Sequence, residues 1–156
     1  AYYPAAFFNA EGFMGALPAD WALIIKMHPF IKEKISVPAA LSERVFDFSD
    51  EREINDILFI TDVLVTDYSS VIFENAVIGN PAVLYAPDLS EYDGGRGFYY
   101  DYSDYSCGEV VSDFESLAPA VLRAKRGNEK LAAFRKRFVP LCDGKSCARF
   151  VNEILK

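Results

Sequence analysis

Residues 63–78 read V-L-V-T-D-Y-S-S-V-I-F-E-N-A-V-I, and this stretch predicts a strand, a tight turn and a helix. Residues 63–65 form a short apolar run, as in a strand buried within a parallel sheet. The next five residues are mostly polar. From Val71 onward, apolar residues recur at helical spacing until Gly79-Asn80-Pro81 ends the helix. The chain is therefore expected to fold around a strand-turn-helix unit.

The turn carries side chains that can cap a helix or bind an anion. Asp67, Ser69 and Ser70 are all good N-cap residues. A helix N-terminus leaves several N–H groups without intrahelical partners and carries roughly half a positive charge, so it suits a phosphate. Two interpretations follow: the serine hydroxyls bind phosphate oxygens, or they only cap the helix.

Strand and helix patterns alternate along the rest of the chain. Short apolar runs predict strands at 21–27, 45–48, 82–85 and 109–111, and helical spacing predicts helices at 51–61, 114–125, 129–138 and 146–155. Residues 1–15 show no period, and residues 86–107 are expected to form a long loop. This order predicts one α/β domain over residues 1–156, with a mostly parallel sheet flanked by helices.

Composition and charge exclude several classes of protein. The chain has 156 residues, of which 51% are hydrophobic, enough for one domain with its own core. No apolar run approaches the roughly 20 residues that span a bilayer, and the first residues lack the basic start of a signal peptide. The net charge of -7 argues against nonspecific nucleic-acid binding but permits a nucleotide in one local pocket.

The sequence contains no motif typical of a cofactor or metal enzyme. It has no G-x-G-x-x-G, no Walker A sequence and no G-x-S-x-G. Cys107, Cys142 and Cys147 have no metal-ligand spacing, and with the single histidine, His28, they do not form a zinc site. We therefore expect no metal, no cofactor and reduced structural cysteines, as in a cytosolic protein.

His28 follows the predicted strand at 21–27 and precedes Pro29, which cannot extend a strand ladder. It is therefore expected at the carboxyl edge of the sheet, where open α/β folds bind ligands. A histidine there can donate to a phosphate or move a proton, or it can be a structural residue. Lys26 shares its face of the strand, and a lysine on a covered strand needs an anionic partner.

Two further side chains have the chemistry to bind a nucleotide. Glu53 lies near the start of a predicted helix, where it can accept from ribose hydroxyls or be an exposed first-turn acid. Arg96 lies in the G-G-R-G sequence of the long loop, where the glycines allow unusual backbone angles. It can clamp a phosphate, or it can be solvated or paired with a nearby aspartate. The loop tyrosines can stack on a base or pack among themselves.

Four motifs occur in an order that points to a family. They are I-K-M-H-P-F at 25–30, D-V-L-V-T-D-Y-S-S-V-I-F-E at 62–74, A-P-D-L…Y…R-G-F-Y at 86–99 and D-G-K-S at 143–146. In this order they resemble the C-terminal half of the CDP-glycerol glycerophosphotransferases, the teichoic-acid primases and polymerases of bacterial walls. The resemblance covers about residues 20–155.

The resemblance implies the donor-binding half of a GT-B fold, in which two Rossmann-like domains face each other across the active-site cleft. It implies that CDP-glycerol contacts the following residues: Lys26, Met27, His28, Phe48, Ser49, Glu53, Asp67, Ser69, Ser70 and Arg96. The segment from Lys26 to His28 and the two serines would meet the phosphates, and Phe48 and Ser49 the cytidine. The family usually has Asp where this chain has Glu53, which reaches one methylene further.

The N-terminal domain of the family, its catalytic histidine and its P-T-x-R motif have no counterpart in this chain. We therefore expect a fragment of a longer protein, which binds nucleotide weakly and does not turn over alone. In the whole enzyme, the resemblance implies that a lipid-linked glycerol-phosphate acceptor attacks the β-phosphorus of CDP-glycerol and that CMP leaves. His28 is the catalytic candidate, placed with Lys26 and the helix N-terminus to offset the growing negative charge.

The basic sequence K-R-G-N-E-K-L-A-A-F-R-K-R at 125–137 has two interpretations. It contacts anionic lipid at the inner face of the cell membrane, or it is a solvated helix face. Two alternatives for the function also stand: a transferase of the same architecture that uses CDP-ribitol or a nucleotide sugar, and an interaction module without a ligand. A module would show no pocket at the Ser69 edge and would satisfy His28 and Lys26 internally.

Overall fold

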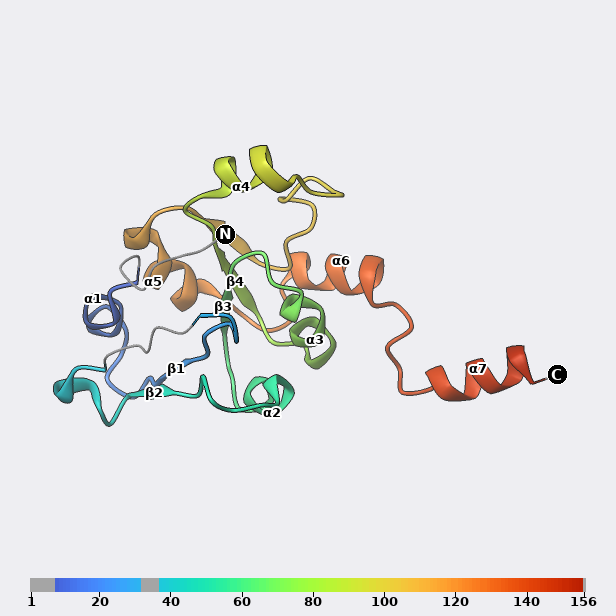
Figure 1. Ribbon diagram of the computed structural model, residues 1–156, viewed down its shortest axis with the longest axis horizontal. Coiled ribbons are helices and arrows are strands. Elements are labelled where there is room, and N and C mark those ends of the chain that lie inside the picture. Colours follow the sequence, from blue (N-terminus) through green and yellow to red (C-terminus); the bar gives the residue numbers. More distant parts are fainter. Residues whose placement is uncertain (1–7, 32–36, 156) are drawn as a thin grey trace.

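The computed structural model describes residues 8–31 and 37–155 of the chain and contains two sets of paired strands (Figure 1). Strand β1 (Leu23–Ile25) pairs with β2 (Val45–Asp47), and β4 (Ala82–Tyr85) lies between β3 (Leu64–Thr66) and β5 (Glu109–Val111). Each of these pairs is parallel. The carboxyl ends of paired strands therefore meet at one edge of their sheet.

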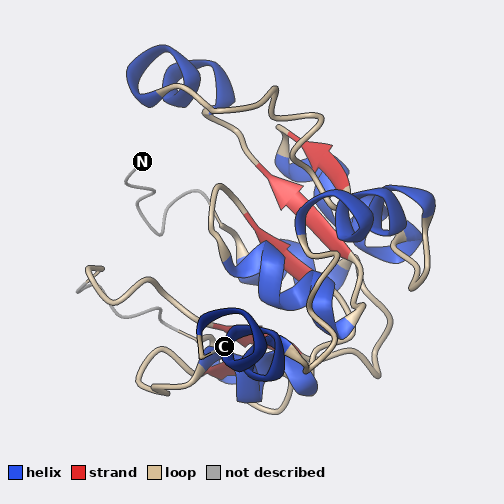
Figure 2. Ribbon diagram, turned by 90° about the vertical axis from the view of Figure 1, so that its right-hand side faces the viewer, coloured by secondary structure: helices blue, strands red, loops and turns tan. Residues whose placement is uncertain are grey.

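Helices lie on both sides of the strands (Figure 2). They are α1 (Ala10–Gly15), α2 (Ile54–Phe59), α3 (Val71–Ile78), α4 (Leu89–Arg96), α5 (Phe114–Arg123), α6 (Glu129–Phe138) and α7 (Ser146–Ile154), with a short 3-10 helix η2 (Ala39–Leu41). Strands and helices alternate in the predicted order. The predicted class, an α/β fold with parallel strands flanked by helices, is therefore confirmed.

The central strand β4 separates two hydrophobic cores. Val83 packs with Ile25 and Val45 of the other sheet in a core that α1 and α5 complete, so the two sheets share one interior. Its neighbours Ala82 and Leu84 pack on the opposite side with α3 and α6. These three residues of β4 are at most 2% exposed. A strand covered on both faces has no polar positions, which explains its continuous apolar sequence.

The strand-turn-helix unit forms as the sequence predicts. A turn leads from β3 into α3, and Gly79 ends the helix with a φ of 87°, in the left-handed region. The next residue, Asn80, is buried and donates through its side chain to the carbonyl oxygens of Leu58 and Thr61, at 3.0 and 2.7 Å. These bonds tie the end of α3 to the end of α2.

Helix α1 forms where the sequence shows no period. It has six residues, and its apolar side chains Phe13 and Met14 are buried against the core. The side chain of Asn9 accepts a hydrogen bond from the Gly12 N–H at 3.0 Å and so caps the first turn. The sequence predicts no element here, because a helix this short is stabilised by its cap and its packing rather than by a repeated pattern.

The segment between β4 and β5 is not the continuous loop that the sequence predicts. It contains α4, which includes Gly94 and Gly95, and in the G-G-R-G sequence Gly97 alone has a positive φ, of 68°. Aromatic contacts from outside the helix hold it: the ring of Tyr92 stacks on that of Tyr68, with centroids 3.8 Å apart. A helix with two glycines has low intrinsic propensity, so this tertiary contact decides its formation.

Helix α7 lies apart from the rest of the molecule (Figure 1). None of its residues is buried, and its apolar side chains Phe150, Val151 and Ile154 are exposed. The helix therefore contributes to neither core. Among the described residues, no helix has the length and apolar character needed to cross a membrane.

Candidate functional site

A broad groove of about 1960 Å³ lies beside β1 and β3 and extends past their carboxyl ends. The predicted donor contacts that line it are Lys26, Met27, His28, Ser49, Asp67, Ser69 and Ser70. Phe48 and Glu53 do not line the groove themselves. They belong to the β2–α2 loop, residues 48–53, whose Ser49, Asp50, Glu51 and Arg52 do. The structure thus brings together residues from two of the four motifs and from the β2–α2 loop at one edge of the strands.

The turn before α3 exposes two serine side chains to the groove. The hydroxyl oxygen of Ser69 accepts a hydrogen bond from the Val71 N–H at 3.3 Å, which is a local cap. Ser70 occupies the N-cap position, and its side chain makes no capping hydrogen bond within the described part of the chain. The N–H of Phe73 already bonds to the Ser70 carbonyl oxygen at 3.0 Å. Capping therefore accounts for Ser69, whereas it leaves the Ser70 hydroxyl for another partner.

The imidazole of His28 is exposed, and the residue lies three positions after the end of β1 at Ile25, which is earlier than the predicted strand end at 27. Its Nδ1 atom accepts a hydrogen bond from the Phe30 N–H at 3.2 Å, and the two rings lie 4.9 Å apart. Because Nδ1 is the acceptor, the neutral ring carries its proton on Nε2. His28 can therefore donate to a ligand through Nε2.

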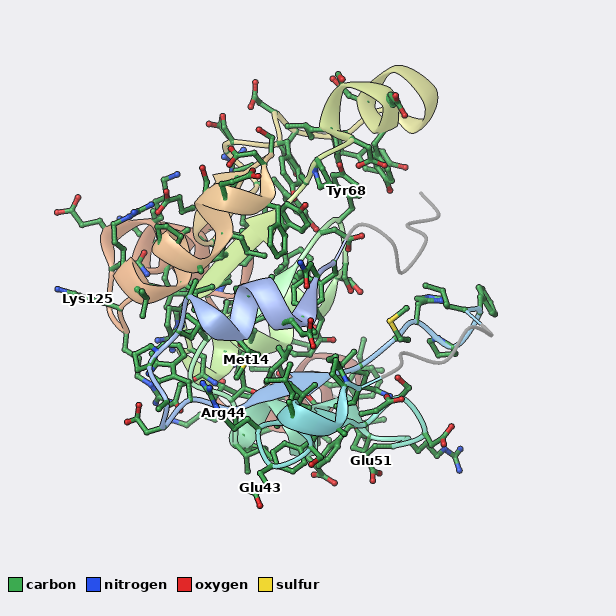
Figure 3. The ribbon with its side chains drawn as sticks, turned by 90° about the vertical axis from the view of Figure 1, so that its left-hand side faces the viewer. Met14, Glu43, Arg44, Glu51, Tyr68 and Lys125 are labelled. Carbon is green, nitrogen blue, oxygen red and sulfur yellow. The ribbon has the colours of Figure 1, made fainter. Side chains whose placement is uncertain are left out.

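Lys26 has a different environment from the one expected. Its Nζ atom donates to the carbonyl oxygens of Phe48 and Ser49, both at 3.4 Å, and to that of Glu51, which is labelled in Figure 3. The Met27 N–H donates to the Ser49 hydroxyl at 3.1 Å. The expectation that a lysine on this strand needs an anionic partner is wrong, since main-chain carbonyl dipoles satisfy it.

Glu53 is the N-cap residue of α2. Its Oε1 atom accepts from the N–H of Asn55 at 3.2 Å and from the Asn55 side-chain amide at 2.9 Å. The hydrogen bond from the Asn55 backbone, followed by that from its side chain, lowers the pKa of the Glu53 carboxyl. The carboxylate is exposed and ionised at neutral pH, so it can cap the helix and still accept from a ribose hydroxyl.

An aromatic cluster lies beside the turn, and the sequence indicates it only weakly. It consists of Tyr68, Tyr92, Phe98 and Tyr102, whose rings contact one another with centroids 3.8 to 5.8 Å apart. Tyr68 is labelled in Figure 3, below the yellow-green helix α4. Burial raises the pKa of both Tyr68 and Tyr102 above its usual value. These tyrosines thus pack among themselves, which was one of the two interpretations.

The cluster also fixes the turn that leads to α3. The Tyr102 hydroxyl donates to the carbonyl oxygen of Asp67 at 3.0 Å, and the Tyr68 hydroxyl donates to Asp88 at 2.6 Å. The only sequence signal for this role is the high number of aromatic residues in a polar segment. Arg96 is the last residue of α4, and its side chain lies outside the described part of the structure, so its phosphate contact stays a prediction.

The sequence of the chain matches a family of known proteins. The sequence profile of the family described as CDP-Glycerol:Poly(glycerophosphate) glycerophosphotransferase matches residues 1–156. The chain belongs to this family. The resemblance drawn from four short motifs is therefore confirmed over the whole chain.

Relatives of this glycerophosphotransferase-family chain include polymerases of two kinds. The teichoic acid poly(ribitol-phosphate) polymerase of Bacillus spizizenii is 34% identical over 155 residues, which are 99% of this chain and 25% of that protein. The teichoic acid poly(glycerol phosphate) polymerase of the same organism is 34% identical over 150 residues, 94% of this chain and 38% of that protein. Sequence identity thus does not separate glycerol phosphate from ribitol phosphate.

The fold is also that of a solved member of the teichoic acid polymerases. The structure of the wall teichoic acid polymerase TagF superposes with a TM-score of 0.76 and 26% identity, over 92% of this chain and 36% of that one. The glycerophosphotransferase-family chain therefore spans about a quarter to two fifths of the length of these relatives.

Proposed function

We propose that this chain is the donor-binding domain, residues 1–156, of a transferase that makes teichoic acid or a related wall or capsule polymer, with CDP-glycerol as its donor. The observation that carries the proposal is one groove that contains a helix N-terminus with two serines and an exposed histidine. A diphosphate needs several donors aimed at one place, and hydroxyls, helix N–H groups and an imidazole meet that need. The family supplies the substrate class.

Each end of the donor has its own contacts in this proposal. The diphosphate lies against Ser69 and Ser70 at the start of α3, and His28 donates to it through Nε2. The cytidine lies against the β2–α2 loop, where Phe48 offers a half-buried ring and Glu53 an ionised acceptor. The remaining contacts come from Met27, Asp67 and Arg96.

The proposed reaction is a displacement at phosphorus. The terminal hydroxyl of a glycerol-phosphate acceptor attacks the β-phosphorus of CDP-glycerol, the bond to the bridging oxygen breaks, and CMP leaves with the electron pair. Negative charge grows on the bridging oxygen, and His28 and the N-terminus of α3 offset it. A preorganised donor of this kind is worth roughly 10²–10³ in rate.

The rest of the active site comes from outside this chain in the proposal. The chain spans a minor part of its relatives, so a second Rossmann-like domain on its N-terminal side completes the GT-B cleft and supplies the catalytic base and the acceptor site. The acceptor is lipid-linked, which places the enzyme at the cytoplasmic face of the membrane. The isolated chain is then expected to bind nucleotide without turning over, and transfer of glycerol phosphate by the chain alone contradicts this division.

CDP-ribitol is the second candidate donor. The observation that favours it is the relative named for ribitol phosphate, which is as similar to this chain as the relative named for glycerol phosphate. The interaction-module alternative is weaker, because a groove is present at the Ser69 edge and His28 is exposed. One of the signs of such a module is nevertheless found, since Lys26 is satisfied by carbonyl groups of the chain itself.

Calorimetric titration of the chain with CDP-glycerol, CDP-ribitol, CMP and UDP tests the proposal. We expect cytidine nucleotides to bind more tightly than UDP. The double substitution Ser69→Ala/Ser70→Ala is expected to weaken CDP-glycerol at least tenfold, because a hydrogen bond to a charged group contributes about 1.5–3 kcal/mol. A stronger response to CDP-ribitol would assign the donor to the second candidate.

A matched control is Ser42→Ala, which removes an exposed hydroxyl before β2, at the opposite edge of the strands from the proposed site. It is expected to leave every affinity unchanged. Absence of binding to all four nucleotides, or equal binding by the wild type and the double variant, contradicts the proposed phosphate site.

A further inference from the structure

The environment of Lys26 gives this residue a role other than binding phosphate. We propose that Lys26 is a positioning residue, which holds the β2–α2 loop in the shape that receives the nucleoside of the donor. The inference rests on the proposed function, because it concerns how the same groove recognises its ligand.

Main-chain oxygens use the whole hydrogen-bonding capacity of the Lys26 ammonium. Its Nζ atom lies 3.4 Å from the carbonyl oxygens of Phe48 and Ser49, and it also contacts that of Glu51. An ammonium has three N–H donors and no acceptor, so three carbonyl oxygens match it one to one. A donor phosphate could bind this ammonium only if the loop gave up one of these contacts.

Backbone hydrogen bonds fix the same loop to the end of β1. The Phe48 N–H donates to the Ile25 carbonyl oxygen at 2.8 Å, and the Met27 N–H donates to the Ser49 hydroxyl at 3.1 Å. The first of these bonds continues the pairing of β1 with β2 past its last register pair, Ile25 with Asp47, and the second joins the chain after β1 to a side chain of the loop. Lys26 lies between the two anchor points in the sequence, and its side chain reaches onward to Glu51. Phe48 and Ser49, which the resemblance assigns to the cytidine, are thus held by backbone and side chain together.

Removal of the cation has a larger effect than the loss of one contact. Three carbonyl oxygens that converge on one point repel each other and lack donors once the ammonium is gone. Methionine has nearly the length of lysine but no charge and no donor, so Lys26→Met is expected to open the loop. Arginine keeps donors on a planar fork, so Lys26→Arg is expected to keep the loop partly closed.

Positioning and phosphate binding predict different losses of affinity. A positioning role makes Lys26→Met weaken cytidine, CMP and CDP-glycerol by the same factor, at least tenfold, because all three ligands contain the nucleoside. A direct phosphate contact leaves the affinity for cytidine unchanged and weakens only the two phosphorylated ligands. The ratio of CMP affinity to cytidine affinity therefore separates the two roles.

The experiment combines ligand titration with amide hydrogen exchange. Wild type, Lys26→Met and Lys26→Arg are titrated with the three ligands by NMR, and exchange of residues 48–53 is measured in the free chain. We expect exchange at least tenfold faster in Lys26→Met and an intermediate rate in Lys26→Arg. Lys130→Met is the matched control, since Lys130 also donates to a carbonyl oxygen, that of Gly108 at 3.4 Å, but does not line the groove. It is expected to change neither measurement.

Two results overturn the inference. One is unchanged exchange of residues 48–53 in Lys26→Met. The other is an unchanged affinity of that variant for cytidine together with a weakened affinity for CMP. Failure of the wild-type chain to bind any of the three ligands counts against the proposed function instead, and the exchange measurement then still decides whether Lys26 holds the loop.

Discussion

The imidazole of His28 is oriented by the residue two positions further along the chain. The Phe30 N–H fixes Nδ1 as an acceptor, which leaves Nε2 as the atom that meets a ligand. This bond comes from the backbone, so it does not depend on the nature of side chain 30. The orientation is therefore built into the local path of the chain after β1.

His28→Ala in the full-length enzyme is expected to lower kcat by roughly 10²–10³, because it removes a donor that acts on the charge developing in the transition state. His28→Gln keeps an N–H donor and is expected to lose less. Steady-state kinetics with CDP-glycerol measures both. Phe30→Ala is a suitable control, since it keeps the backbone N–H that orients the ring. Turnover by His28→Ala close to that of the wild type contradicts a catalytic role.

The residue types in the sequence predicted where the polar side chains lie better than they predicted which groups these side chains bond to. Lys26 and Glu53 both lie near the groove, as the sequence indicates. Lys26, however, bonds to three carbonyl oxygens and Glu53 caps α2. The Lys26 partners do not follow from spacing in the sequence, because a bond across 22 residues depends on where the next strand lies. The Glu53 partner is local, since Asn55 lies only two residues further along the chain.

Strand β4 contributes side chains to both hydrophobic cores. The chain just before β5 approaches its backbone very closely. Gly108 precedes β5 and lies against the backbone of Ala82 at the start of β4. A Cβ atom at Gly108 would lie 1.8 Å from the Ala82 carbonyl oxygen and 2.6 Å from its carbonyl carbon. Backbone atoms of a buried strand cannot move aside, so this position requires glycine.

Gly108→Ala is expected to destabilise the fold by about 3 kcal/mol or more, since overpacking against rigid backbone exceeds the usual cost of 1–3 kcal/mol in a core. Urea unfolding followed by circular dichroism measures the change. Gly94→Ala is the control: it lies in α4 with no atom near the new methyl group, and it is expected to stabilise by roughly 0.4–1 kcal/mol. Equal unfolding midpoints for Gly108→Ala and the wild type would rule out the close approach.

At the scale of the whole molecule, charge is distributed unevenly. The chain has a net charge of -7, yet the last turn of α6 carries Arg135, Lys136 and Arg137, all exposed. The opposite face of this helix is buried through Leu131 and Phe134. The three basic side chains are thus exposed at the end of the helix, as the membrane interpretation of residues 125–137 requires.

We expect the chain to float with vesicles of anionic lipid and not with vesicles of neutral lipid. Replacement of the three basic residues of the last α6 turn by glutamine is expected to weaken this binding on the order of a hundredfold, since each charge near the surface contributes about 1 kcal/mol. The binding is also expected to fall with added salt. Flotation that is unchanged by the triple substitution supports the other interpretation, a solvated helix face.

Local patterns in the sequence determined most of the architecture. The strand-turn-helix unit, β4 and the bounds of α6 follow from apolar runs, helical spacing and the glycine and proline stops, all of which act over a few residues. Four short motifs also indicated the family, because they combine residue identity with order. None of these features depends on contacts with distant segments of the chain.

The tertiary structure alone decided which groups pair across long separations. Helix α4 forms on a sequence with two glycines because Tyr92 stacks on Tyr68, and the Asp67 turn is held by Tyr102, 35 residues away. Lys26 meets carbonyl groups of a loop that only the pairing of β1 with β2 brings near. Such contacts leave little trace in the sequence, because neither residue has its partner until the fold brings two distant segments together.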